Sequence, residues 1–98
     1  MSIGSRAVAP VYSGCGWVNL YQDWDTHLMT AICQAESRGN PNAINTHNTD
    51  GVDDFGLLQL HGQDILNPAQ NITAGHNIWL RQGYTAWTSY NNGTYLFY

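Results

Sequence analysis

The chain has no lysine, and its permanently charged cations are the three arginines Arg6, Arg38 and Arg81 in 98 residues. Seven acidic residues outnumber them and give a formal net charge of −4 at pH 7. A protein that binds nucleic acid needs cations to displace the counterions of the phosphate backbone. This scarcity of positive charge excludes nucleic acid as a partner, and it predicts mild repulsion from any anionic polymer.

Long apolar runs are also missing from the sequence. No stretch approaches the roughly 20 apolar residues that a membrane-spanning helix needs. The opening segment MSIGSRAVAPVYSG has one arginine and no continuous apolar centre, which is not the pattern of a secretory signal peptide. We therefore expect no membrane span, and no signal peptide is visible in this chain.

Cysteine is scarce, with only Cys15 and Cys33 present. One disulfide is possible, but a single pair leaves the bridged and the reduced states open and does not fix the redox compartment. No CxxC or HExxH spacing occurs, and the four histidines are scattered along the chain. We expect neither a metal ion nor a cofactor.

The length of the chain predicts one domain, close to the lower size limit for a self-sufficient core. Residues 1–13 are rich in Ser, Gly and Pro and show no periodicity, so we expect an irregular N-terminal arm. The domain itself is expected over residues 14–98. A hydrophobic fraction of 43%, with four Trp and six Tyr, supplies the surface that a core needs.

Helix start and stop signals divide this domain into segments. Asp23 or Asp25 offers an N-cap for one apolar-periodic segment, while Asn67, Pro68 and Gly83 bracket another. Helices dominate and strand content is small, so the predicted class is α+β and predominantly helical. The expected elements are a short helix within 15–22, a helix over 26–37, a loop over 38–51, a small strand or hairpin within 52–62, a helix over 68–82 and a last helix of one or two turns around 85–90.

Glu36 is the only glutamate, and it falls in the last turn of the helix expected over 26–37. A carboxylate at a helix C-terminus opposes the macrodipole, so helix stability alone does not favour it. If apolar neighbours also desolvate it, both effects raise its pKa, as a general acid working near neutral pH requires. The alternative is a solvated glutamate at a fraying helix end.

Three aspartates, Asp50, Asp53 and Asp54, crowd the segment that follows this helix. One of them can face Glu36 across a cleft. Two carboxylates in unlike environments suit glycoside cleavage, in which one protonates the leaving oxygen and the other stabilises or captures the sugar cation. A calcium loop or a plain turn are the alternatives, although the EF-hand spacing is absent.

Several motifs in the same order resemble the core of the C-type lysozymes. They are Glu36-Ser37 followed by NTDGVDDFGLLQLHG, then NITAGHNIW, then YTAWTSY. The segments AES, NPNAI and GLLQL are also similar to the soluble lytic transglycosylases and to small phage and actinobacterial lysozyme-like domains. The resemblance spans roughly residues 15 to 95, and it implies a compact lysozyme-like fold with a small β-hairpin region beside the catalytic helix.

Residue by residue, the resemblance makes Glu36 the general acid and Asp54 the second carboxylate. The interval between them is one residue longer than in the C-type pattern, which leaves Asp53 as a substitute for Asp54. Trp87 matches the tryptophan that walls the acid, with plain core packing as its alternative. The raised pKa of the acid is a known property of lysozymes and is carried over with the resemblance.

The resemblance also implies a set of substrate-binding side chains. Asn48 and His61 fall where the family has two amides near the second carboxylate; Asn48 matches and His61 departs from the pattern. Ser37 and Gln59 are expected to contact sugar amides or to orient the loop. The family's sugar-stacking tryptophans have no counterpart after QLHG, so we expect sugar stacking from Tyr90, or from Tyr84 or Tyr95.

The implied activity is that of a bacteriolytic muramidase, which hydrolyses the β-1,4 bond between N-acetylmuramic acid and N-acetylglucosamine in peptidoglycan. One alternative is a lytic transglycosylase that leaves 1,6-anhydro-muramic products with Glu36 alone. Another is a non-catalytic glycan-binding module of a wall-penetrating assembly. We expect a monomer whose partner is the glycan strand and whose location is extracellular, periplasmic or phage-associated.

Overall fold

The computed structural model describes residues 11–98, so most of the arm expected over 1–13 lies outside the described part. Residues 11–13 form no regular element. In chain order the structure contains the 3₁₀ helix η2 (Gly14–Leu20), helix α1 (Thr26–Ser37), strands β1 (Ile44–Asn45), β2 (Asp54–Phe55) and β3 (Leu60–His61), helix α2 (Pro68–Gln82), the 3₁₀ helix η3 (Gly83–Ala86), helix α3 (Thr88–Asn91) and the 3₁₀ helix η4 (Thr94–Phe97).

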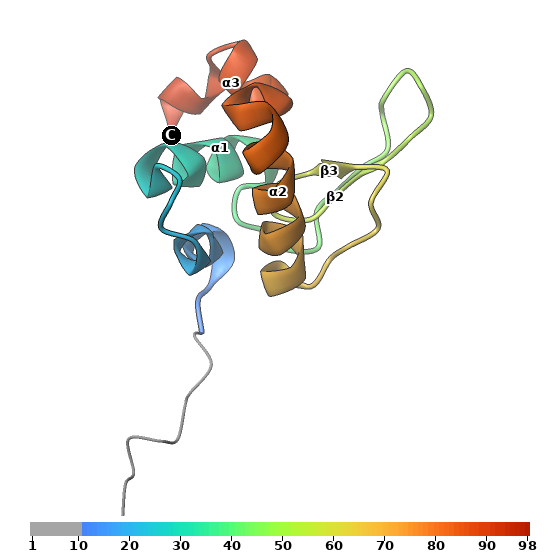
Figure 1. Cartoon of the computed structure of the whole chain (residues 1–98). Coiled ribbons are helices and arrows are strands. Elements are labelled where there is room, and N and C mark those ends of the chain that lie inside the picture. The colour runs from blue at the N-terminus through green and yellow to red at the C-terminus, as the bar shows by residue number, and fades with distance from the viewer. Residues whose placement is uncertain (1–10) are drawn as a thin grey trace, which may run out of the picture.

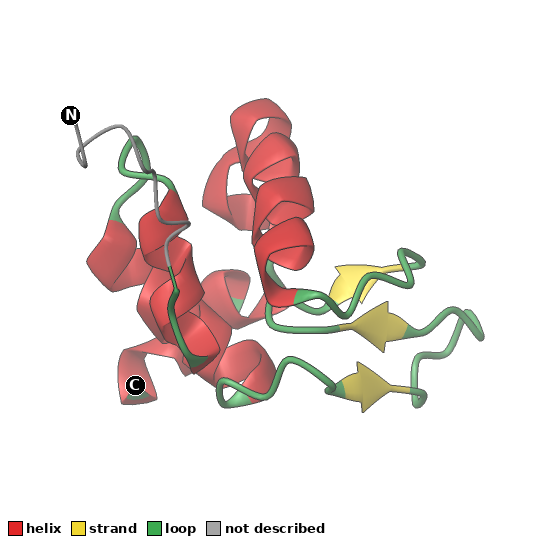
Figure 2. Cartoon of the chain, turned by 90° about the horizontal axis from the view of Figure 1, so that it is seen from below, coloured by secondary structure: helices red, strands yellow, loops and turns green. Residues whose placement is uncertain are grey.

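The helices gather on one side of the molecule and the three short strands extend from the other (Figures 1 and 2). The strands form one antiparallel sheet in the order β1-β2-β3. The predicted α+β, predominantly helical fold is therefore confirmed. No helix within residues 11–98 combines the length and the apolar character that a membrane crossing would require.

Helix α1 begins and ends where the local sequence predicts. The Asp25 side chain accepts a hydrogen bond from the Leu28 N–H at 3.1 Å, so Asp25 rather than Asp23 is the N-cap. At the other end, Arg38 takes a left-handed conformation with φ 54°, which stops the helix. Glu36 consequently lies in the last turn of α1, as predicted.

Helix α2 follows the predicted bounds as well. Asn67 caps it by accepting a hydrogen bond from the Gln70 N–H at 3.0 Å, and Pro68 occupies its first position. Gly83, with φ 66°, ends it. This 15-residue helix packs against η2 and η3.

The short helix predicted within 15–22 is present as the 3₁₀ helix η2. Two other local predictions were wrong in detail. The segment 38–51, expected to be a loop because it is dense in Asn, Gly and Pro, contains β1, and this strand forms by pairing with β2. The last predicted helix is divided between η3 and α3 because the intervening Trp87 has extended backbone angles.

The core lies where η2, α1, α2 and the segment after β2 meet, and it is mostly aliphatic. A disulfide between Cys15 and Cys33, which the sequence left open, joins η2 to α1 with the two Cα atoms 5.8 Å apart. This bond braces the helix that carries Glu36. The buried hydrophobic residues are Cys15, Val18, Trp24, Met29, Ile32, Cys33, Leu57, Leu58, Leu60, Ile72 and Trp87.

The fully buried Asn71 connects α2 to the strand region. Its side-chain oxygen accepts a hydrogen bond from the Leu58 N–H at 2.9 Å, and its amide donates to the carbonyls of Phe55 and Ile65 at 2.9 and 2.8 Å. The amide packs so closely on Gly56, which has φ 76°, that a Cβ there would collide with it. These contacts fix the position of β2 relative to the helices.

Candidate active site

A cavity of about 320 Å³ lies between the end of α1, the strands and the start of α3. Glu36 enters it from the helical side and Asp54 from the strand side. Six of the eight side chains predicted from the sequence line this cavity. The lining residues are Glu36, Asn48, Asp54, Gln59, His61, Ala86, Trp87 and Thr88.

Glu36 lines the cavity from the last turn of α1, and its side chain is partly buried. Burial raises the pKa of its carboxyl, and the nearby negative charge of Asp54 adds a smaller upward effect. The Ser89 hydroxyl and the Ser89 N–H, which donates to Glu36 Oε2 at 3.2 Å, partly oppose this rise. Because burial outweighs these hydrogen bonds, the pKa of Glu36 is raised from its ordinary value of 4.5.

Trp87 closes the cavity beside Glu36 while also belonging to the core. Its side chain is almost fully buried, and its indole N–H donates to the Leu58 carbonyl at 2.9 Å. The sequence offered the cavity wall and the core as alternatives for Trp87, and the structure gives it both positions. The indole of Trp87 thus gives the cavity that holds Glu36 an apolar wall.

Asp54 lies in a row of polar side chains that crosses the three strands. The register pairs Asn45 with Asp54 and Asp54 with His61, and directly opposed residues of antiparallel strands share one face. His61 Nδ1 lies 2.7 Å from Asp54 Oδ1, and the amide of Asn48 donates to Oδ2 at 2.9 Å. Asn45 adds a longer contact of 3.4 Å to Oδ2. Asp54 therefore has three hydrogen-bonding side chains around it, whereas Glu36 accepts from the Ser89 N–H.

His61 bridges two aspartates. Its Nδ1 contacts Asp54 and its Nε2 lies 2.7 Å from Asp50 Oδ2, so both ring nitrogens donate when the ring is protonated. Hydrogen bonding to Asp54, and then to Asp50, raises the pKa of His61 from its ordinary value of 6.5. The pKa of Asp50 is lowered, mainly by the Val52 N–H and in part by His61.

Gln59 lines the cavity from the turn between β2 and β3. It has a left-handed backbone conformation, with φ 50°, which is uncommon for a residue other than glycine. Its side-chain amide donates to the carbonyls of Gly56 at 2.9 Å and Ala43 at 3.0 Å, and these bonds hold the turn in place. Backbone strain of this kind is often found at functional sites.

Two predicted site residues lie outside the cavity. Ser37 is buried at the end of α1, where its hydroxyl donates to the Cys33 carbonyl at 3.2 Å. Tyr90 belongs to a row of aromatic rings with Tyr84 and Tyr95, at centroid distances of 5.7 and 5.3 Å. None of these three tyrosines lines the cavity that holds Glu36 and Asp54.

Sequence reasoning missed two contributors to the site, Ser89 and Asn45, and it did not assign Asp50 to His61. Ser89 acts on Glu36 partly through its backbone N–H, a group that every non-proline residue carries. Asn45 reaches Asp54 only because β1 pairs with β2. The cluster of aspartates was recognised, and within it Asp54 lines the cavity whereas Asp53 does not.

A second cavity, of about 270 Å³, adjoins the first and shares Gln59, His61, Ala86 and Trp87 with it. It continues along α2 to Arg81 in the last turn of that helix. We call these two neighbouring cavities together the groove. The additional lining residues are Leu60, Gln63, Ile78, Arg81 and Gln82.

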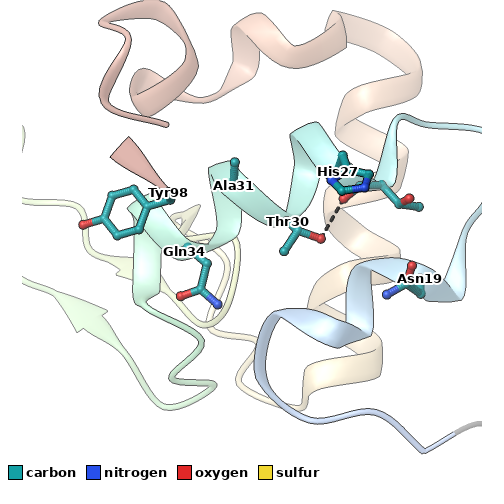
Figure 3. A pocket seen from close by; sticks show the side chains of 7 residues that line it. Asn19, His27, Thr30, Ala31, Gln34 and Tyr98 are labelled. Carbon is teal, nitrogen blue, oxygen red and sulfur yellow. Dashed lines mark hydrogen bonds between the residues drawn. The ribbon is translucent and has the colours of Figure 1, made fainter. Parts of the chain in front are cut away.

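A pocket of about 400 Å³ lies elsewhere, on the outer face of α1 (Figure 3). His27 and Gln34 line it from α1, and Tyr98 closes one end. No carboxylate side chain lines it, so it offers no acid for bond cleavage. Nor do His, Cys, Asp and Glu side chains gather in groups of three or more suited to a metal ion anywhere within residues 11–98.

The architecture is shared with lysozymes of known structure. A lysozyme from Equus asinus is similar with a TM-score of 0.60 at 18% sequence identity, over 85% of this chain and 88% of that one. A lysozyme from Litopenaeus vannamei is similar with a TM-score of 0.55 at 22% identity, over 85% and 86% of the two chains. The fold is thus lysozyme-like.

The chain belongs to the transglycosylase SLT domain family, which it matches over residues 20–96. No curated protein matches the sequence significantly. The family and the fold agree with the resemblance found in the sequence. The protein is a peptidoglycan-cleaving enzyme, either a hydrolase or a lytic transglycosylase.

Proposed function

We propose that the protein is a muramidase that hydrolyses the β-1,4 bond between N-acetylmuramic acid and N-acetylglucosamine. The observation that carries this proposal is the placement of Glu36 and Asp54 in one cavity, in a dry and a polar environment respectively. Such a pair supplies a protonated acid and an anion at the same pH. A glycosidase needs both.

In the proposed mechanism Glu36 gives its proton to the glycosidic oxygen, and the bond between that oxygen and C1 of the muramic acid breaks. Asp54 stabilises or captures the positive C1. A water molecule then attacks C1 and returns its proton to Glu36, so that the new muramic end is a reducing sugar. Asn48 and His61 orient Asp54 for this role through their hydrogen bonds to its two oxygens.

A lytic transglycosylase is the second candidate, and membership in the SLT family favours it. In that reaction Glu36 again protonates the glycosidic oxygen. The C6 hydroxyl of the same muramic acid then attacks C1 and returns a proton to Glu36, which leaves a 1,6-anhydro ring. No second carboxylate is needed, so Asp54 would be dispensable.

Digestion of purified peptidoglycan, followed by mass spectrometry of the muropeptides, separates the two candidates. The muramidase gives reducing muramic ends, and both Glu36→Gln and Asp54→Asn lose activity. Products lighter by one water, together with an active Asp54→Asn variant, would establish the transglycosylase instead. Asp53→Asn is the matched control, since it makes the same chemical change at a neighbouring residue that does not line the cavity.

The same digest tests the third possibility, a non-catalytic module that only holds glycan. Such a module binds peptidoglycan without creating new ends, and Glu36→Gln behaves like the unmodified chain. We further propose that the chain works as a monomer in an extracellular, periplasmic or phage-associated setting. Light scattering during size-exclusion chromatography checks the monomer, and a dimer mass would contradict it.

A further inference from the structure

Arg81 is the one arginine among the residues that line the groove, and it lines the second cavity but not the cavity that holds Glu36 and Asp54. Every ion pair among residues 11–98 involves a histidine, so no described carboxylate pairs with Arg81. The other positive group of the groove, protonated His61, already has Asp50 and Asp54 as partners. Arg81 thus offers an unused guanidinium in the wall of a cleft.

The surroundings of Arg81 suit a peptide-like or carboxylate-bearing ligand. The amides of Gln63 and Gln82 supply donors and acceptors, and Ile78 supplies an apolar wall. A guanidinium binds a carboxylate through two parallel hydrogen bonds, which a flexible ammonium group does not match. An arginine here also has a local reason, since a cation in the last turn of α2 complements the helix macrodipole.

We propose that Arg81 binds a carboxylate carried by the muramic acid of the substrate, either on its stem peptide or on its lactyl group. The inference rests on the proposed function and adds a contact with a carboxylate of the muramic acid to the recognition of the sugar chain. In a chain of net charge −4, Arg81 places one attractive contact where the anionic polymer enters the groove.

Three ligands of equal sugar length distinguish the sources of this carboxylate. A strand with stem peptides presents peptide carboxylates while its lactyl carboxyls are tied up as amides. A strand stripped of its peptides presents free lactyl carboxylates. A chitin oligomer presents neither group.

Calorimetric binding in a Glu36→Gln background keeps the ligands intact during the measurement. With Arg81→Gln added, binding of at least one carboxylate-bearing ligand is expected to weaken about three- to fivefold, whereas chitin binding stays unchanged. The ligand that responds identifies the source of the carboxylate. Arg81→Lys is expected to retain part of the affinity, and higher salt shrinks the difference.

Arg38→Gln is the matched control, because it removes the same charge from an exposed arginine that lines neither cavity. Equal weakening by Arg81→Gln for chitin and for the carboxylate-bearing ligands, or no weakening for any of them, would overturn the inference. Failure of the Glu36→Gln protein with intact Arg81 to bind any of the three would contradict the proposed function itself. The two failures are therefore distinguishable.

Discussion

The two walls of the cleft are formed by different elements, and they surround their carboxyl groups with different neighbours. The helical wall holds Glu36 at the end of α1, beside the buried Trp87 and with Ser89 as its hydrogen-bonding neighbour. The strand wall surrounds Asp54 with amides and an imidazole, and its side chain remains 19% exposed. The helical wall desolvates the carboxyl of Glu36, whereas the strand wall places hydrogen-bond donors around the carboxylate of Asp54.

The two walls therefore give two carboxyl groups of one cavity different surroundings. Burial raises the pKa of Glu36, which favours a proton on that carboxyl. Asp54 instead lies within the sheet, where the register brings Asn45 and His61 to either side of it. The disulfide between Cys15 and Cys33 braces the helical wall, and Asn71 ties the strand region to it.

The largest expected effect comes from removing the acid of the helical wall. Glu36→Gln keeps the size of the side chain but cannot give a proton to the glycosidic oxygen. We expect peptidoglycan cleavage to fall by about 10²- to 10⁴-fold, measured as release of soluble muropeptides. Retention of more than a tenth of the activity would mean that another group protonates the leaving oxygen.

The same substitution is expected to stabilise the fold at neutral pH. Because the folded-state pKa of Glu36 is raised, its ionisation costs stability as pH rises from the ordinary value of 4.5 through the folded-state value. Glu36→Gln removes this cost. Its free energy of unfolding should exceed that of the parent protein at neutral pH and approach it below pH 4.5. Urea unfolding at several pH values measures both, and a constant difference across pH would contradict the account.

Removing the anion of the strand wall should have the next largest effect. In the muramidase, Asp54→Asn loses stabilisation of the positive C1, and we expect about a 10²-fold loss of activity. Removal of that negative charge should also lower the pKa of Glu36, because Asp54 contributes to its rise. The pH–rate profile reports this shift. Equal losses in Asp53→Asn would show that the effect is not specific to the cavity.

Substitution of His61 changes the strand wall in a pH-dependent way. The raised pKa of His61 means that its contacts with Asp50 and Asp54 stabilise the fold fully below pH 6.5, and that this stabilisation is lost as pH rises through the folded-state value. We expect His61→Asn to alter the pH–rate profile. Its stability should differ from that of the parent protein most at low pH. Thermal unfolding from pH 5 to 9 measures the second effect. Identical profiles for the two proteins would remove His61 from the site.

The smallest predicted effect concerns Ser89. The Ser89 hydroxyl is buried without a hydrogen-bond partner among the described residues, and its nearness to Glu36 favours the ionised form of that carboxyl, so Ser89→Ala should raise the pKa of Glu36 further. The alkaline limb of the pH–rate profile would then move to higher pH, while the maximal rate changes little. Ser13→Ala is the control, because it removes the same hydroxyl from an exposed residue that lines neither cavity. Movement of the limb in the opposite direction would contradict the assigned role.

The elements with local signals could be predicted from the sequence. Asp25 and Asn67 cap their helices through side chains that sequence reasoning recognises, and Gly83 stops α2 by a backbone conformation that glycine favours. Glu36 could be singled out because it is the only glutamate and ends an amphipathic helix. In these cases the cause lies within a few residues of the effect.

The contacts that depend on tertiary pairing could not be predicted. Asn45 reaches Asp54 only after β1 pairs with β2, and a strand of two residues carries no sequence pattern that predicts this pairing. Tyr90 was expected at the sugar because the family's sugar-stacking tryptophans have no counterpart after QLHG, yet its ring packs with Tyr84 and Tyr95 outside the cavity. The sequence shows that an aromatic residue is present but does not fix the direction of its side chain.

The protonation state of Glu36 is the central claim, and the chain offers a direct way to measure it. Since Glu36 is the only glutamate, protein labelled with carboxyl-¹³C glutamate gives one glutamate side-chain resonance to follow by NMR as pH is varied. The account predicts a titration midpoint above 4.5, which falls when Asp54 is replaced by Asn. A midpoint at or below 4.5 would show that the helical wall does not keep Glu36 protonated, and it would contradict Glu36 as the general acid.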